Sequence, residues 1–117
     1  MKGDELKERT KQFALRIMKL VDALPNTVAG RVIANQIMRS GSSVSANYRA
    51  ACRARSNAEF ISKLGIVLEE ADETEFWIEL IIDGELLPNE KVEALKKEAE
   101  EITAIMASSR KTAQNHK

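Results

Sequence analysis

The chain has 117 residues, which is enough for one domain whose core folds without disulfides or a structural metal. Its single cysteine, Cys52, excludes an intrachain disulfide. The charged N-terminus has no apolar leader, and no run of 18 apolar residues occurs, so we expect a soluble cytoplasmic protein without a membrane partner.

Basic and acidic residues number 18 each, so the net charge of zero predicts no overall affinity for polyanions. The two halves of the chain differ, however. Residues 1–56 hold eleven basic and four acidic residues, whereas residues 57–117 hold seven basic and fourteen acidic residues. This asymmetry predicts either a basic surface patch or salt bridges between the two halves.

The first predicted helix spans residues 5–24, where apolar residues recur at alternating intervals of four and three. Pro25 ends this helix, and Asn26-Thr27 offers an N-cap for the next one.

The second predicted helix spans residues 27–54 and contains the flexible-looking segment Ser40-Gly41-Ser42-Ser43. At about 100° per residue, an apolar edge and an arginine-rich edge stay in phase on both sides of that segment. If the helix were broken at this segment, nothing would keep the two edges in phase. The pattern therefore predicts one uninterrupted helix about 40 Å long.

The third predicted helix spans residues 57–83 and begins with a capping box at Ser56-Asn57-Ala58-Glu59. The fourth spans residues 89–108, and the pattern then fades into a tail, 109–117, that we expect to be frayed. Short loops between four helices predict a single all-α domain over residues 1–117, an antiparallel up-and-down four-helix bundle.

The arginine-rich edge is the main candidate for a binding surface. Arginine forks match phosphate oxygens, and no feature reads base sequence, so we expect recognition of structured RNA or another nucleic acid by its backbone. The candidate contact residues are Arg31, Arg39, Arg49, Arg53 and Arg55.

The alternative is that the arginines form salt bridges within the bundle. Folding the second and third helices about Ser56 places Arg53 near Glu59 and Arg39 near Glu73. Arg31 and Arg49 have no acidic residue at their mirrored positions. The protein would then be a scaffold that binds a protein partner.

Small residues make the middle of the second helix thin, which suits either tight packing within the bundle or close approach by a second subunit. The second reading is favoured by apolar residues that lie to one side of the core stripe of the third helix and that a lone bundle would expose. These residues are Ile66, Trp77, Leu80 and Ile81.

Catalytic chemistry is poorly represented. The only histidine, His116, lies in the polar tail, and no glycine-rich phosphate loop occurs. The acidic residues of the third helix lie between core positions, so we expect a solvated or salt-bridged face. We therefore expect no enzyme, no metal site and no cofactor; a metal-dependent carboxylate enzyme is the weakest of the three function hypotheses.

Several segments together resemble the bacterial four-helix-bundle proteins of the 23S ribosomal RNA intervening-sequence family. The resemblance covers about Lys11 to Pro88. It is carried by Gln36-Ile37-Met38-Arg39-Ser40, Ala46-Asn47-Tyr48-Arg49-Ala50-Ala51, Glu59-Phe60, Leu64, Glu69-Glu70-Ala71-Asp72-Glu73-Thr74 and Trp77.

The resemblance implies a left-handed bundle that assembles as a homopentamer. It also implies a relationship to the accessory proteins of diversity-generating retroelements, which bind nucleic acid and a reverse transcriptase. The segment Gln36 to Ala51 would then line contacts between helices and subunits, and Gly41, Ser45 and Tyr48 join the expected interface residues.

Overall fold

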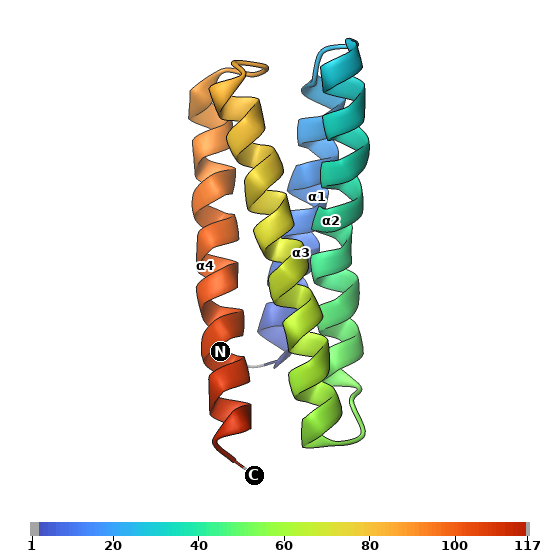
Figure 1. Ribbon diagram of the computed structural model, residues 1–117, viewed down its shortest axis with the longest axis vertical. Helices are drawn as coiled ribbons and strands as arrows, with labels where there is room; N and C mark the ends of the chain where they lie inside the picture. Colours follow the sequence, from blue (N-terminus) through green and yellow to red (C-terminus); the bar gives the residue numbers. More distant parts are fainter. Residues whose placement is uncertain (1–2, 117) are drawn as a thin grey trace.

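The computed structural model describes residues 3–116, which form four α-helices and no strand (Figure 1). The helices are α1 (Gly3–Ala23), α2 (Val28–Cys52), α3 (Asn57–Asp83) and α4 (Asn89–Gln114). They run alternately up and down and form a rod of 48 × 21 × 20 Å (Figure 1). The predicted all-α, four-helix architecture is confirmed. None of the helices within residues 3–116 is long and apolar enough to cross a bilayer.

The starts of α2 and α3 follow the predicted capping signals. The Thr27 hydroxyl accepts a hydrogen bond from the Gly30 N–H at 3.1 Å, and the Ser56 hydroxyl accepts one from the Glu59 N–H at 3.0 Å. Gly30 also allows the preceding turn to fold back, because a Cβ there would lie 1.9 Å from the carbonyl oxygen of Pro25.

The α2 helix passes without interruption through its small-residue segment, as the phase of its two edges predicted. The Ser42 hydroxyl donates to the Met38 carbonyl at 2.7 Å, which satisfies this polar group within the helix. Gly41 lies against α1, where a Cβ would come within 2.9 Å of Ile17 Cγ1. On the α3 side, the Thr74 hydroxyl donates to the buried Ser40 hydroxyl at 2.8 Å. At these two positions the thin segment serves packing within the protomer.

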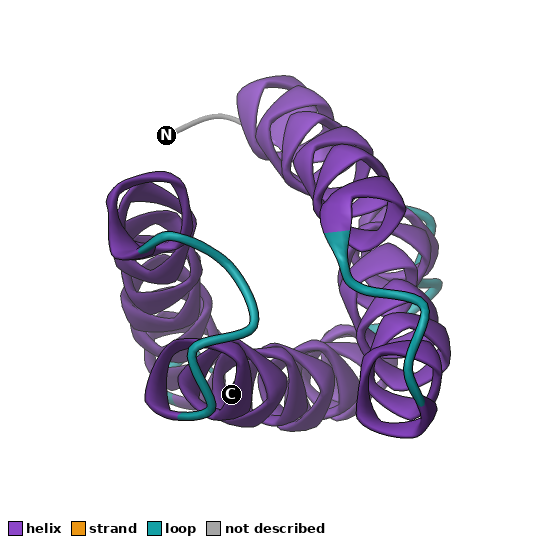
Figure 2. Cartoon of the chain, turned by 90° about the horizontal axis from the view of Figure 1, so that it is seen from above, coloured by secondary structure: helices purple, strands orange, loops and turns teal. Residues whose placement is uncertain are grey.

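One continuous core joins all four helices. Each helix buries an apolar face in it, and α2 and α3, which each pack closely against two neighbouring helices, pack most extensively. The pair α1 and α4 has by far the weakest contact, and the view along the bundle shows this side as the open one (Figure 2). The largest fully buried side chains of the core are Phe13, Ile17, Ile37, Leu64, Ile78, Ile81, Ile102 and Met106.

The prediction that residues 109–117 are frayed is wrong over most of its length, because α4 continues to Gln114. Two polar contacts to the start of α3 hold this end. Arg110 Nε donates to the Ile61 carbonyl at 3.1 Å, and Asn57 Nδ2 donates to the Ala113 carbonyl at 2.8 Å. Neither contact has a signature in the periodicity of the sequence.

Candidate nucleic-acid interface

All five predicted contact arginines are exposed. Arg31, Arg39 and Arg49 lie on α2, Arg53 is its C-cap, and Arg55 lies in the following loop. At 1.5 Å per residue, the span from Arg31 to Arg53 is about 33 Å. The arginines therefore form an elongated series along one helix rather than a compact pocket.

Arg39 forms salt bridges within the chain. Its guanidinium forms salt bridges with Glu70, at 3.0 Å, and with Glu73 on α3. Glu73 also accepts a hydrogen bond from the Trp77 indole N–H at 3.0 Å. Hydrogen bonding to Arg39, and then to Trp77, lowers the pKa of the Glu73 carboxyl, and the pairing raises the pKa of Arg39. The expected Arg39–Glu73 pair is confirmed.

The other four candidate arginines have no carboxylate partner among residues 3–116. Arg31 donates to the neutral Asn26 side chain at 3.1 Å. Within residues 3–116, no salt bridge or side-chain hydrogen bond involves Arg49, Arg53 or Arg55, so the alternative pairing of Arg53 with Glu59 is not formed. Four of the five candidate residues remain available to an anionic ligand. We call this set, Arg31, Arg49, Arg53 and Arg55, the α2 arginine edge.

A second arginine pairing joins the two ends of the chain and was not singled out from the sequence. Arg9 on α1 forms a two-pronged salt bridge with Glu98 on α4, with both N···O distances at 2.8 Å, and reaches Glu101 at 3.3 Å. This hydrogen bonding lowers the pKa of the Glu98 carboxyl. The opposite charges of the two halves of the chain were the available signal, since they allowed for salt bridges of this kind.

Some acidic residues of α3 are exposed, and others are half-buried with a polar partner. Glu70 and Glu73 pair with Arg39, and the half-buried Glu75 accepts a hydrogen bond from the Thr103 hydroxyl at 2.9 Å. Burial, which outweighs that hydrogen bond, raises the pKa of the Glu75 carboxyl, and repulsion from Glu100 adds to the shift. Within the described part of the chain, no group of three or more histidine, cysteine or acidic side chains is arranged to hold a metal ion.

Four of the seven expected interface residues are buried inside the protomer: Gly41, Ser45, Tyr48 and Ile81. Ile81 is fully buried, so its assignment to one side of the core stripe is wrong. The helix α3 packs against helices on two sides, which widens its buried face beyond a single stripe. These four residues contribute packing within the chain.

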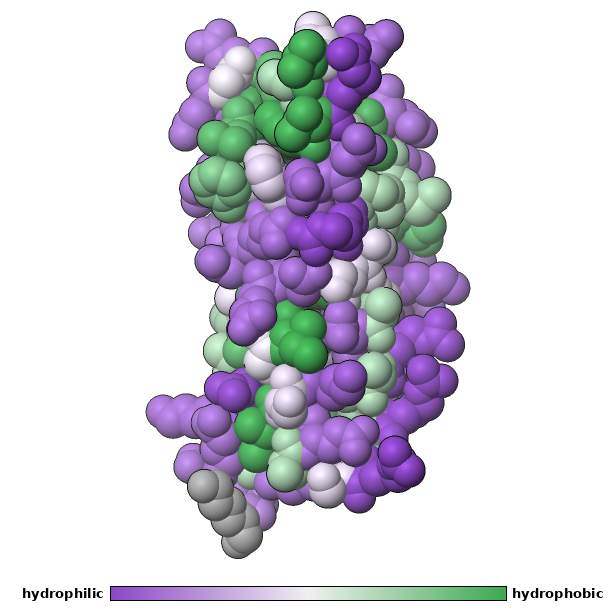
Figure 3. Space-filling model, turned by 45° about the vertical axis from the view of Figure 1, so that its right-hand side comes forward, coloured by the Kyte–Doolittle hydropathy of each residue, from purple (hydrophilic) through white to green (hydrophobic). Residues whose placement is uncertain are grey.

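The other three expected residues remain at the surface. Ile66 and Leu80 are each 37% exposed, and Trp77 is half-buried against the core. The sequence reasoning missed Phe76, which is 49% exposed and packs edge-on against Trp77, with ring centroids 5.1 Å apart. On the face shown in Figure 3, apolar patches alternate with polar side chains and do not merge into one surface.

Comparison with known proteins places this geometry in a family. A crystal structure of a protein of unknown function from the S23 ribosomal protein family of Bacteroides thetaiotaomicron superimposes with a TM-score of 0.85. It is 42% identical in sequence, and the match covers 91% of this chain and 98% of the other. No curated protein matches the chain. The sequence profile described as 23S rRNA-intervening sequence protein matches residues 4–108, and the chain belongs to that family.

Proposed function

We propose that this protein is a non-enzymatic module that binds structured RNA through the α2 arginine edge. The observation that carries the proposal is that these four exposed arginines lack a carboxylate partner among the described residues, whereas Arg39 has two. The family description also points to RNA, because it refers to 23S rRNA.

Recognition through this edge depends on the phosphate backbone. A guanidinium offers a planar fork to phosphate oxygens, and a series about 33 Å long can follow the backbone of a folded RNA. Contacts of guanidinium groups with phosphate oxygens carry no information about base sequence. Shape and charge would therefore select the RNA.

We further propose a left-handed bundle that assembles as a homopentamer, as the family resemblance implies. Repetition of the same edge in each subunit would add weak contacts into a stronger one through avidity. The exposed Ile66, Phe76 and Leu80 on α3 support an association surface, because burial in an assembly would remove this apolar area from water.

RNA binding is tested by gel shift with a structured RNA at several salt concentrations. Four phosphate contacts predict a slope of about −3 in log K against log salt, which is about 50- to 150-fold weaker binding at 200 mM than at 50 mM salt. The double variant Arg31→Glu with Arg49→Glu should lose most binding and keep its unfolding temperature. A matched control, Lys97→Glu with Lys111→Glu, makes the same charge change at exposed positions of α4 and should retain binding.

The second candidate function is a protein-binding scaffold, which the internal use of Arg39 and the exposed apolar residues of α3 favour. This candidate predicts no RNA binding even at 50 mM salt. Light scattering of Leu80→Glu tests the association surface, since a charge at an interface should lower the mass of the assembly. An unchanged mass would remove Leu80 from the interface.

A further inference from the structure

The open side of the bundle, between α1 and α4, contains a groove of about 500 Å³. Its lining residues belong to the last turns of α1, the first turns of α4 and the loop before α4. These segments lie at the end of the bundle opposite the last residues of α2 (Figure 1). The groove is separate from the α2 arginine edge, because residues of α1, α4 and the loop before α4 line it. A ligand in this groove would bind whether or not the α2 arginine edge binds RNA.

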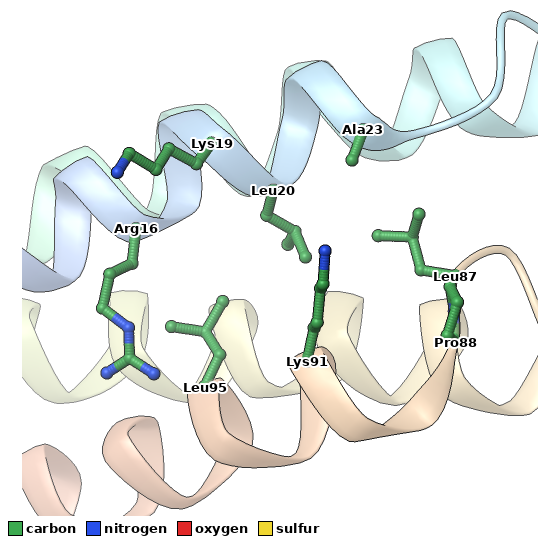
Figure 4. Close-up of a pocket in the computed structure, with 8 residues that line it drawn as sticks. All are labelled: Arg16, Lys19, Leu20, Ala23, Leu87, Pro88, Lys91 and Leu95. Carbon is green, nitrogen blue, oxygen red and sulfur yellow. The ribbon is translucent and has the colours of Figure 1, made fainter.

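The floor of the groove is apolar. Leu20 from α1 and Leu95 from α4 face each other across it, and Leu87 closes the loop end (Figure 4). Leu20 is 8% exposed and Leu95 is 3% exposed, so the floor is the edge of the hydrophobic core itself. An alkyl chain on this floor would lose water contact along its length, which favours binding.

The rim of the groove is cationic. Arg16 and Lys19 from α1 and Lys91 from α4 line it, and among the described residues no carboxylate does. In Figure 4, Arg16 extends from α1 towards α4, and Lys91 extends from α4 into the gap. Within residues 3–116, none of the three forms a salt bridge. The charge of Arg16 helps to lower the pKa of the Glu98 carboxyl, but Arg9 already binds both oxygens of that carboxylate.

The start of α4 adds to the positive potential at this rim. Its N-cap is Pro88, which also lines the groove and provides no side-chain hydrogen bond to the first turn. The N-terminus of a helix carries partial positive charge and unpaired N–H groups. Glu90 lies on the same first turn but does not line the groove.

We propose that this groove binds a small amphiphile with an unbranched alkyl chain and one carboxylate head group. The chain lies on the leucine floor, and the carboxylate lies at the rim beside Lys91 and Arg16. A volume of about 500 Å³ lies within the range of sites that bind small molecules.

Calorimetric titration of the full chain with sodium octanoate tests the proposal. Two probes separate the parts of the ligand: 1-octanol has the same chain without the charge, and acetate has the charge without the chain. We expect octanoate to bind, 1-octanol to bind about fivefold or more weakly, and acetate not to bind.

Variants locate the site. Lys91→Gln should weaken octanoate binding about fivefold, whereas Lys97→Gln, at an exposed position of α4 outside the groove, should leave it unchanged. Ala23→Phe should weaken octanoate and 1-octanol alike, because the ring would occupy the groove. Equal affinity for octanoate and 1-octanol, no effect of Lys91→Gln, or no octanoate binding at millimolar concentration would each overturn the proposal.

Discussion

Replacing Gly41 by alanine tests how closely α1 and α2 approach each other. The new Cβ would lie 2.9 Å from Ile17 Cγ1 and 3.2 Å from Ile17 Cγ2, and the Ile17 side chain is fully buried. Both distances are shorter than a normal carbon–carbon contact, so the helices must separate or Ile17 must leave its rotamer. Overpacking of this kind costs about 1–3 kcal/mol.

The gain in helix propensity partly offsets that cost. Alanine is more favourable than glycine inside a helix by about 1 kcal/mol, so Gly41→Ala should destabilise the protein by about 0–2 kcal/mol. Gly65→Ala is the matched control. The atoms nearest to a Cβ at Gly65 belong to the Arg110 side chain, at 3.5 Å or more, so this variant should gain about 1 kcal/mol of stability.

Urea and thermal unfolding at one fixed protein concentration measure both variants, since the stability of an assembly depends on concentration. The two unfolding temperatures should differ by about 3–12 °C, with Gly65→Ala the higher. Ile17→Ala is destabilising by itself, but it should make Gly41→Ala less costly when the two are combined. If Gly41→Ala stabilised the protein as much as Gly65→Ala, the close contact between α1 and α2 would be refuted.

Three further substitutions test polar contacts by urea unfolding. Arg9→Lys loses the two-pronged contact with Glu98 and should cost about 1 kcal/mol at pH 7; because Arg9 lowers the pKa of Glu98, the cost should shrink as pH falls below about 4.3. Glu75→Gln should stabilise the protein at pH 7, because the raised pKa marks an ionised form that folding disfavours, and the gain should vanish below about pH 4.3. Thr74→Val removes the buried hydrogen bond to Ser40 and should cost about 1–2 kcal/mol at every pH. If the effects of Arg9→Lys and Glu75→Gln did not depend on pH, the pKa shifts assigned to Glu98 and Glu75 would be contradicted.

Much of the fold could be predicted from the sequence because it depends on local signals. Helical periodicity, the caps at Thr27 and Ser56, and the continuous phase across Ser40–Ser43 each involve residues within a few turns of one another. The length of α4 could not be predicted in this way. It depends on contacts of Asn57 and Arg110 with backbone carbonyls more than 45 residues away.

The sequence predicted which arginines lie at the candidate site, but not all of the carboxylates with which arginines pair. Mirroring α2 onto α3 identified the partner of Arg39 correctly, because those helices are neighbours joined by a short turn. It could not find the partner of Arg9, which lies 89 residues away on a helix brought close only by the whole bundle. The single core stripe assigned to α3 from its periodicity misplaced Ile81, since one stripe cannot describe a helix buried from two directions.

The start of α1, the end of α4 and the turn that carries Arg55 lie towards the same end of the rod (Figure 1). An affinity tag or fluorescent fusion at either terminus would therefore lie near Arg53 and Arg55. Charges on the tag would then compete with RNA for these arginines or bind RNA themselves. A label introduced in the turn between α3 and α4 would sit at the far end of the rod, about 48 Å in length. Measurements made with that label and with a terminal tag would report on opposite ends of the same molecule.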